Sequence, residues 1–237
     1  MRLPRPTSAA LLALIASAAL AVAACGREQE PDLVNGKTLF VQKCGSCHVL
    51  ARANTRGVQG PDLDQAFDAA RHDGMNDDTV AGVVRKQIAN VRRSSTMPED
   101  LVVDDDARDV AAYVGEAAGM PGEDKGPLAQ AGKPKTSNKP VKASGGQLKI
   151  DADPTGALAF VSTKATTPAG KVTFAMGNKS SVQHNIAIKG GPDVKGPVVG
   201  QGGTSRFNTS LKKGKYTFYC SVPGHEEGGM KGEVTVE

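Results

Sequence analysis

The sequence is short of long apolar runs, of cysteine and of histidine. Beyond residue 24 it has no stretch that is apolar over a length sufficient to cross a bilayer. Its 237 residues include four cysteines and four histidines. So few histidines leave no cluster that could bind a substrate-accessible metal ion in addition to those in the motifs described below. This argues against an enzyme such as a copper reductase.

The first residues predict an export signal. A short basic start and an apolar run from Ala9 to Ala24 precede Cys25. A run this short that ends in small residues is typical of a cleaved signal rather than a spanning helix. The stretch "VAAC" also resembles the lipobox of bacterial lipoproteins, which implies that residues 1–24 are removed and that Cys25 carries the lipid. A plain signal peptide would instead leave Cys25 as a free thiol in an oxidising compartment.

Four cysteines in an exported chain first suggest two disulfides. However, three of them lie in motifs with other uses. Cys44 and Cys47 belong to the stretch "CGSCH", and Cys220 begins the loop "CSVPGHEEGGM". With lipid on Cys25, no cysteine remains for a bridge, so the count favours cofactor sites over disulfides.

Composition divides the rest of the chain into three parts. Residues 120–146 are rich in proline, glycine, lysine, serine and alanine and nearly lack large apolar side chains, which predicts a flexible linker. Residues 31–119 carry apolar residues at helical spacing in 32–44, 76–93 and 104–119, and we expect an all-α domain there. Residues 147–237 consist of short alternating or β-branched segments between turn residues, which predicts an all-β sandwich or small barrel.

The stretch "CGSCH" predicts a covalently bound haem. Two thiols three positions apart can add to the vinyl groups of one haem, and the adjacent His48 then lies beneath the iron as a proximal ligand. A redox-active thiol pair or half of a zinc site would use the same cysteines. Neither is favoured, because no strand-helix-strand pattern surrounds the motif and no second Cys or His pair lies near it.

Spacing alone leaves the distal haem ligand open. Met75, Met97, Met120 and His72 are candidates, and a methionine in a small domain is more often core filler than a ligand. Met97 is favoured over the others because it lies in the irregular stretch "SSTMPEDL" between two predicted helices.

The C-terminal part carries a ligand set for copper. Cys220, His225 and Met230 are spaced C-x4-H-x4-M along one loop, and His184 lies on an earlier predicted strand. One thiolate, two imidazoles and a weak axial thioether form the ligand set of a type 1 copper site. His184 alone would be an ordinary surface or core histidine, but residues 147–237 contain only these two histidines and this one cysteine. A binuclear copper centre would need a second cysteine in the loop.

Residues 32–118 resemble a class I cytochrome c in the stretches "GKTLFVQKCGSCH", "GPDL", "TMP" and "DVAAYV". The resemblance implies that Cys44 and Cys47 hold the haem, that His48 and Met97 ligate the iron, and that Pro61 packs near His48. Iron with both axial positions filled has no open site for a substrate, so the resemblance implies electron transfer rather than oxygen or peroxide chemistry.

Residues 147–237 resemble the cupredoxins of the plastocyanin, azurin and auracyanin group in the stretches "NKSSVQHNIAI" and "LKKGKYTFYCSVPGHEEGGMKGEVTV". The resemblance implies a Greek-key β-sandwich in which Asn185 ties two ligand loops together. It also implies that the equatorial copper ligands are His184, Cys220 and His225 and that the axial ligand is Met230.

The sequence therefore predicts a multidomain chain with one haem c and one type 1 copper, an electron carrier and not an enzyme. We expect it on the outer face of the bacterial cytoplasmic membrane, on the periplasmic or extracellular side, held there by lipid. Its expected partners are redox proteins or membrane respiratory complexes, with no nucleic acid and no small-molecule substrate. The alternatives are a copper-storage or copper-sensing lipoprotein with a cytochrome domain, and a redox subunit of a larger oxidoreductase complex.

Overall fold

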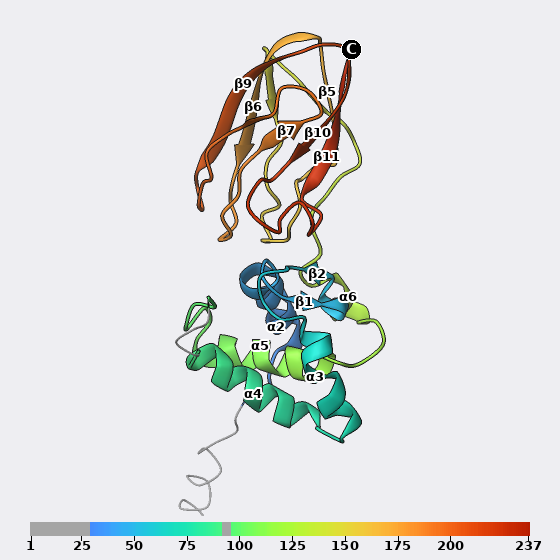
Figure 1. The fold of residues 1–237 in the computed structure, drawn as a ribbon. Helices are drawn as coiled ribbons and strands as arrows, with labels where there is room; N and C mark the ends of the chain where they lie inside the picture. The colour runs from blue at the N-terminus through green and yellow to red at the C-terminus, as the bar shows by residue number, and fades with distance from the viewer. Residues whose placement is uncertain (1–28, 92–95) are drawn as a thin grey trace, which may run out of the picture. The chain divides into compact units, whose positions relative to one another are not determined.

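The computed structural model describes residues 29–91 and 96–237. Residues Pro31–Glu237 form one compact unit, with a helical part first and a β-sheet part after it (Figure 1). The predicted signal at 1–24 and the predicted lipid site at Cys25 lie outside the described residues. Among the residues that are described, no helix combines the length and the apolar character needed to span a membrane.

The helical part surrounds the residues expected to hold haem. Its four longer helices are α2 (Leu33–Leu39), α3 (Leu63–His72), α4 (Asp77–Ala89) and α5 (Asp104–Ala117). Its shorter elements are the π-helical turn η1 (Phe40–Cys44), which continues α2, the strands β1 (Val49–Leu50) and β2 (Thr55–Arg56), and the 3-10 turn η2 (Ala51–Ala53).

Three of these helices were expected, and α3 was not. None of the residues of α3 is fully buried, and only two of them, Leu63 and Phe67, are large apolar residues that pack against the helical core. The N-cap of α4 is Asn76, whose side chain accepts a hydrogen bond from the backbone N–H of Thr79 at 2.9 Å.

The helical core lies where α2 and η1 meet α5. Gly36 allows this close packing, because a Cβ at this position would overlap the backbone of Asp109 in α5. The Phe40 and Tyr113 rings pack at 6.4 Å between centroids, and both side chains are almost fully buried. The core includes Cys44 of the expected haem motif, so the motif begins on an element that packs in the core.

The β-sheet part consists of two sheets with a shared core. The larger has the strand order β3-β5-β11-β10-β7-β8 and the smaller β4-β6-β9. The strands of the larger sheet are β3 (Val141–Lys142), β5 (Lys164–Thr167), β7 (Ala187–Lys189), β8 (Val194–Lys195), β10 (Gly214–Tyr219) and β11 (Lys231–Val236). Those of the smaller sheet are β4 (Gln147–Lys149), β6 (Gly170–Gly177) and β9 (Thr204–Leu211).

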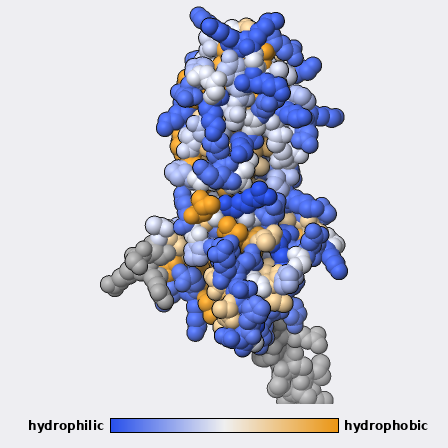
Figure 2. Space-filling view, turned by 45° about the vertical axis from the view of Figure 1, so that its right-hand side comes forward, coloured by the Kyte–Doolittle hydropathy of each residue, from blue (hydrophilic) through white to orange (hydrophobic). Residues whose placement is uncertain are grey.

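Alternating side chains fill the space between the sheets, as the period of the sequence predicts. Phe174 of β6 stacks on Phe207 of β9 with ring centroids 4.9 Å apart, and Phe160 meets Phe218 of β10 edge to face at 5.3 Å. On the face shown in Figure 2, the surface of this part is largely hydrophilic. The expected order, a helical region followed by a region of packed β-sheets, is confirmed.

The segment 120–146, expected to be a flexible linker, contains the helix α6 (Gly126–Gln130) and the strand β3. At its start the Asp124 carboxylate, 3% exposed, accepts hydrogen bonds from Lys37 Nζ at 2.8 Å, Arg52 Nε at 2.8 Å and Tyr113 Oη at 2.9 Å. At its end β3 pairs in parallel with β5. Both ends are thus attached to neighbouring elements, while the flexibility of the segment and the domain boundaries stay predictions.

Candidate metal centres

Three donor side chains converge at one end of the β-sheet part. His184 precedes β7, Cys220 follows β10, and His225 lies in the loop that leads into β11. The Nδ1 atoms of the two histidines are 3.2 Å apart, and Cys220 Sγ lies 4.0 Å from Nδ1 of His184 and 3.5 Å from Nδ1 of His225. The side chains are 0%, 0% and 4% exposed for His184, Cys220 and His225. The three donor atoms therefore form a small buried triangle.

This triangle has the size and chemistry of a metal site. Bonds of about 2.0 Å to nitrogen and about 2.3 Å to sulfur, the lengths found in zinc sites, span such separations from a single central ion. The opposite nitrogen of His184, Nε2, is buried without a hydrogen-bond partner among the described residues, whereas Nδ1 faces the other donors. Two imidazoles and one thiolate in a plane are the ligand set of blue copper.

Burial sets the protonation of these groups before any metal binds. It lowers the pKa of His184 to about 3, with repulsion from His225 adding to the effect. It lowers the pKa of His225 to about 4, although Glu227 acts in the opposite direction. Both rings are therefore neutral at pH 7, which is the form that binds a metal. Burial raises the pKa of the Cys220 thiol. The thiol therefore keeps its proton until a metal cation binds to the sulfur and displaces it.

The ligand loop is closed by backbone hydrogen bonds. Cys220 N–H donates to Met230 O at 3.0 Å, and Met230 N–H donates to His225 O at 2.9 Å. The loop turns at Gly224 and Gly229, whose φ angles of +81° and +109° are unfavourable for other residues. Met230 is fully buried in the β-sheet core. The loop thus keeps the three ligand-type residues predicted from it on one short segment that is closed by hydrogen bonds.

Asn185 joins the two segments that supply the donors. Its Oδ1 accepts from the backbone N–H of Ser221 at 2.8 Å, and its Nδ2 donates to Ser221 Oγ and to Gly196 O, both at 2.9 Å. Its own backbone N–H points at Cys220 Sγ at 3.4 Å. These are the contacts expected of a residue that ties the ligand loops together. The sequence prediction missed Ser221, for which adjacency to Cys220 is the only signal.

Asn178 is a second residue that sequence reasoning missed. It is 1% exposed, and its Nδ2 donates to Val182 O at 2.7 Å and Val199 O at 3.1 Å. Its Oδ1 accepts from the backbone N–H of Ser180 at 3.0 Å. The turn that leads to His184 is therefore fixed by a buried amide. In the sequence, Asn178 looks like an ordinary turn residue after a strand.

In the helical part, Cys44, Cys47 and His48 share one turn. The backbone N–H groups of Cys47 and His48 both donate to Cys44 O at 3.0 Å. Neither cysteine forms a disulfide within the described residues. Burial raises the pKa of Cys44 to about 12, with Cys47 adding to the effect and Lys43 opposing it. A redox-active thiol pair needs a lowered pKa, so this environment disfavours that alternative to haem attachment.

His48 is oriented by the loop that follows the motif. Its Nδ1 lies 2.9 Å from Pro61 O. A carbonyl can only accept, so Nδ1 carries the proton and Nε2 remains for a metal. The ring also packs on Gly60, where a Cβ would come within 2.5 Å of His48 Cε1. Pro61 therefore contacts His48 through its carbonyl group.

Met97 is the predicted distal ligand of the haem iron. Met97 is partly buried and packs against the helical core cluster, and residues 92–95, just before it, lie outside the described residues. Among the other candidates, the His72 side chain is 81% exposed and Met120 is 42% exposed. Packing against the core distinguishes Met97 from these two, and its role as the distal ligand stays a prediction.

Two sites for one-electron metal centres thus lie in one chain, and comparisons with known proteins identify the domains that hold them. Residues 33–118 match the cytochrome c family. Residues 146–237 match the copper binding proteins of the plastocyanin/azurin family. The chain is therefore a cytochrome c domain followed by a plastocyanin/azurin-type copper domain. Its cofactors are haem c and type 1 copper.

Auracyanins are among the individual relatives. Auracyanin-B of Chloroflexus aurantiacus is 31% identical over 113 residues, which cover 34% of this chain and 48% of that protein. The chain thus spans about half the length of this curated relative. The dithionite-reduced auracyanin of Roseiflexus castenholzii is 27% identical, covering 40% of this chain and 99% of that one, with a TM-score of 0.36. Auracyanin A of Chloroflexus aurantiacus is 26% identical, covering 40% and 99%, with a TM-score of 0.35.

Proposed function

We propose that this chain is a lipid-anchored electron carrier on the outer face of the bacterial cytoplasmic membrane. It relays single electrons between a membrane respiratory complex and another redox protein. The observation that carries the proposal is the buried triangle of His184, Cys220 and His225 donor atoms in a chain whose other domain is a cytochrome c. Both domains are typical of electron carriers.

The geometry of the copper ligands supports redox cycling over copper storage. The three donor side chains are at most 4% exposed, and the loop that holds two of them is closed by hydrogen bonds at both ends. A storage site must release its metal, which requires ligands that can move apart. Here the fixed, buried ligands favour a copper ion that stays in place while its charge changes.

A redox titration followed by absorption tests this function. We expect the oxidised holoprotein to show an intense thiolate-to-copper band together with low-spin haem bands that sharpen on reduction, both reversibly over repeated cycles. The two midpoint potentials would identify which centre is the donor. Release of copper on reduction, or haem bands without a copper band, would contradict the relay.

Anchoring requires a separate test, because it depends on Cys25 alone. In a bacterial host that processes lipoproteins, we expect the mature chain to begin at Cys25, to carry a mass increase from acyl chains and to partition into detergent. A Cys25→Ala variant should lose all three properties while keeping both sets of absorption bands. A wild-type chain with an unmodified N-terminus in the aqueous phase would refute the anchor.

A further inference from the structure

Within the compact unit Pro31–Glu237, the copper-ligand loop touches the segment that follows the haem motif. Gln59 Nε2 donates to Pro223 O at 3.3 Å. A Cβ on Gly224 would lie 2.9 Å from Val58 Cγ2, so the two residues are in direct contact. Pro223 and Gly224 immediately precede the ligand His225. The contact therefore lies beside both cofactor sites.

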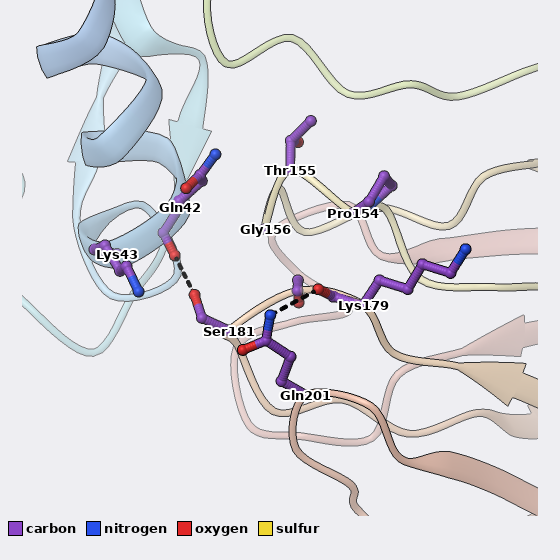
Figure 3. A pocket seen from close by; sticks show the side chains of 9 residues that line it. Gln42, Lys43, Pro154, Thr155, Gly156, Lys179, Ser181 and Gln201 are labelled. Carbon is purple, nitrogen blue, oxygen red and sulfur yellow. Dashed lines mark hydrogen bonds between the residues drawn. The ribbon is translucent and has the colours of Figure 1, made fainter.

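A second contact lies on the other side of the haem motif. Ser181 Oγ donates to Gln42 O at 3.5 Å, and a Cβ on Gly156 would come within 2.9 Å of Gln42 Cα. Figure 3 shows Gln42 beside Ser181, with the Lys179 side chain directed away from both. These residues and Lys43 line a small cavity of about 140 Å³. Gln42 and Lys43 come directly before Cys44. The haem motif is thus flanked on both sides by residues that contact the copper domain.

We propose that Val58 and Gln59 seat the copper-ligand loop on the haem-attachment loop, and that electrons pass between the two centres of one chain at this contact. Cys47 Sγ lies 3.7 Å from Gln59 Oε1, and Gln59 Nε2 lies 3.3 Å from Pro223 O. From the haem-attached sulfur to the backbone of His225, the path therefore has two through-space steps. The transfer moves one electron between the two metals, with no bond made or broken and no further reactant.

Two consequences follow for how the chain works, and both rest on the electron-carrier function proposed above. The side chains that make the contact are uncharged, and the nearby cavity is lined by the like-charged Lys43 and Lys179. Transfer at this contact should therefore depend little on ionic strength. In addition, Val58, which is 62% exposed, and Gln59 lie against Pro223 and Gly224 beside His225, so they shield part of this loop from external reductants.

The test uses the holoprotein with both metals. Three variants are measured: Gln59→Ala, Val58→Asp and the double variant that combines them. The control is Gln87→Ala, a change at an exposed position on α4. Loss of one neutral hydrogen bond lowers the ratio of docked to undocked molecules about fivefold. After rapid reduction of the haem, we expect transfer to copper to slow in Gln59→Ala and to slow further in the double variant. Direct reduction of copper by a small external reductant should become faster in the same order.

A structural measurement makes the test independent of electron transfer. In the fully reduced, diamagnetic holoprotein, backbone amide relaxation should give one tumbling time for both domains of the wild type and Gln87→Ala, and two shorter ones in the double variant. The proposed contact would be overturned if the rates of intramolecular electron transfer were unchanged and both domains shared one tumbling time in all variants. The carrier function would remain intact in that case. A wild type whose copper and haem do not both cycle would instead overturn the proposed function.

Discussion

Replacing Cys220 with serine is expected to abolish the intense visible absorption of the copper centre and to leave the haem bands unchanged. The band depends on a thiolate bound to copper, and Cys220 Sγ is the sulfur in the triangle with the two histidine Nδ1 atoms. Serine fills nearly the same space, but its hydroxyl does not ionise in a site where burial already raises the pKa of the more acidic thiol. Absorption of the copper-loaded, oxidised protein is the measurement.

The matched control is His72→Gln, which removes a histidine whose side chain is 81% exposed on α3. It should keep both sets of bands. Because Cys220 is fully buried, circular dichroism of the serine variant must show that the β-sheet part is folded. A folded Cys220→Ser protein that still shows the intense band would mean that its sulfur ligand is another residue.

The copper site could be predicted largely because its ligands are concentrated in sequence. Cys220, His225 and Met230 lie on one loop, whose glycines mark the turns it needs. His184 lies 36 residues before Cys220, and it was connected to the loop by the scarcity of histidine and by the resemblance of "NKSSVQHNIAI" to cupredoxins. Buried polar residues such as Asn178 could not be found in this way, because an asparagine that holds a turn together has the same local pattern as one that faces solvent.

The helical part shows a different limit. The helices α4 and α5 bury apolar side chains and were expected, whereas α3 has only two large apolar residues, Leu63 and Phe67, both partly buried, and was missed. The composition of residues 120–146 describes this segment only on average and does not show which of its side chains are buried. In "PGEDKG", one of three neighbouring charged side chains, Asp124, is buried against two cations from distant parts of the chain. Nothing local distinguishes it from Glu123, which is exposed.

Replacing Asp124 with asparagine is expected to produce the largest loss of stability among conservative changes in the helical part. Lys37 is 6% exposed and bonds to Asp124 and to Leu128 O, so the variant would leave a buried ammonium without its anion. Breaking a buried ion pair in this way costs about 3 to 5 kcal/mol. For a domain of this size the melting temperature should fall by roughly 12 °C or more. Thermal unfolding followed through the haem absorption measures this shift.

Three comparisons identify the buried charge as the cause. Glu123→Gln removes an exposed neighbouring charge and should change the melting temperature little. Adding Lys37→Met to Asp124→Asn removes the unpaired ammonium and should recover part of the loss, because an apolar side chain of similar length replaces it. Equal and small effects of Asp124→Asn and Glu123→Gln would show that Asp124 is not a buried partner of Lys37 in solution.

The pH dependence should identify the same carboxylate. Burial alone would raise the pKa of Asp124, but the hydrogen bonds from Lys37, Arg52 and Tyr113 outweigh it and hold this pKa below its usual value. A carboxyl whose pKa is lowered by folding stabilises the fold above its unfolded pKa, and that contribution is lost as the pH falls through the folded pKa. The stability difference between wild type and Asp124→Asn should therefore be full at neutral pH and shrink below about pH 4. A difference that stays constant down to pH 2 would mean that the ionised carboxylate is not what Lys37 requires.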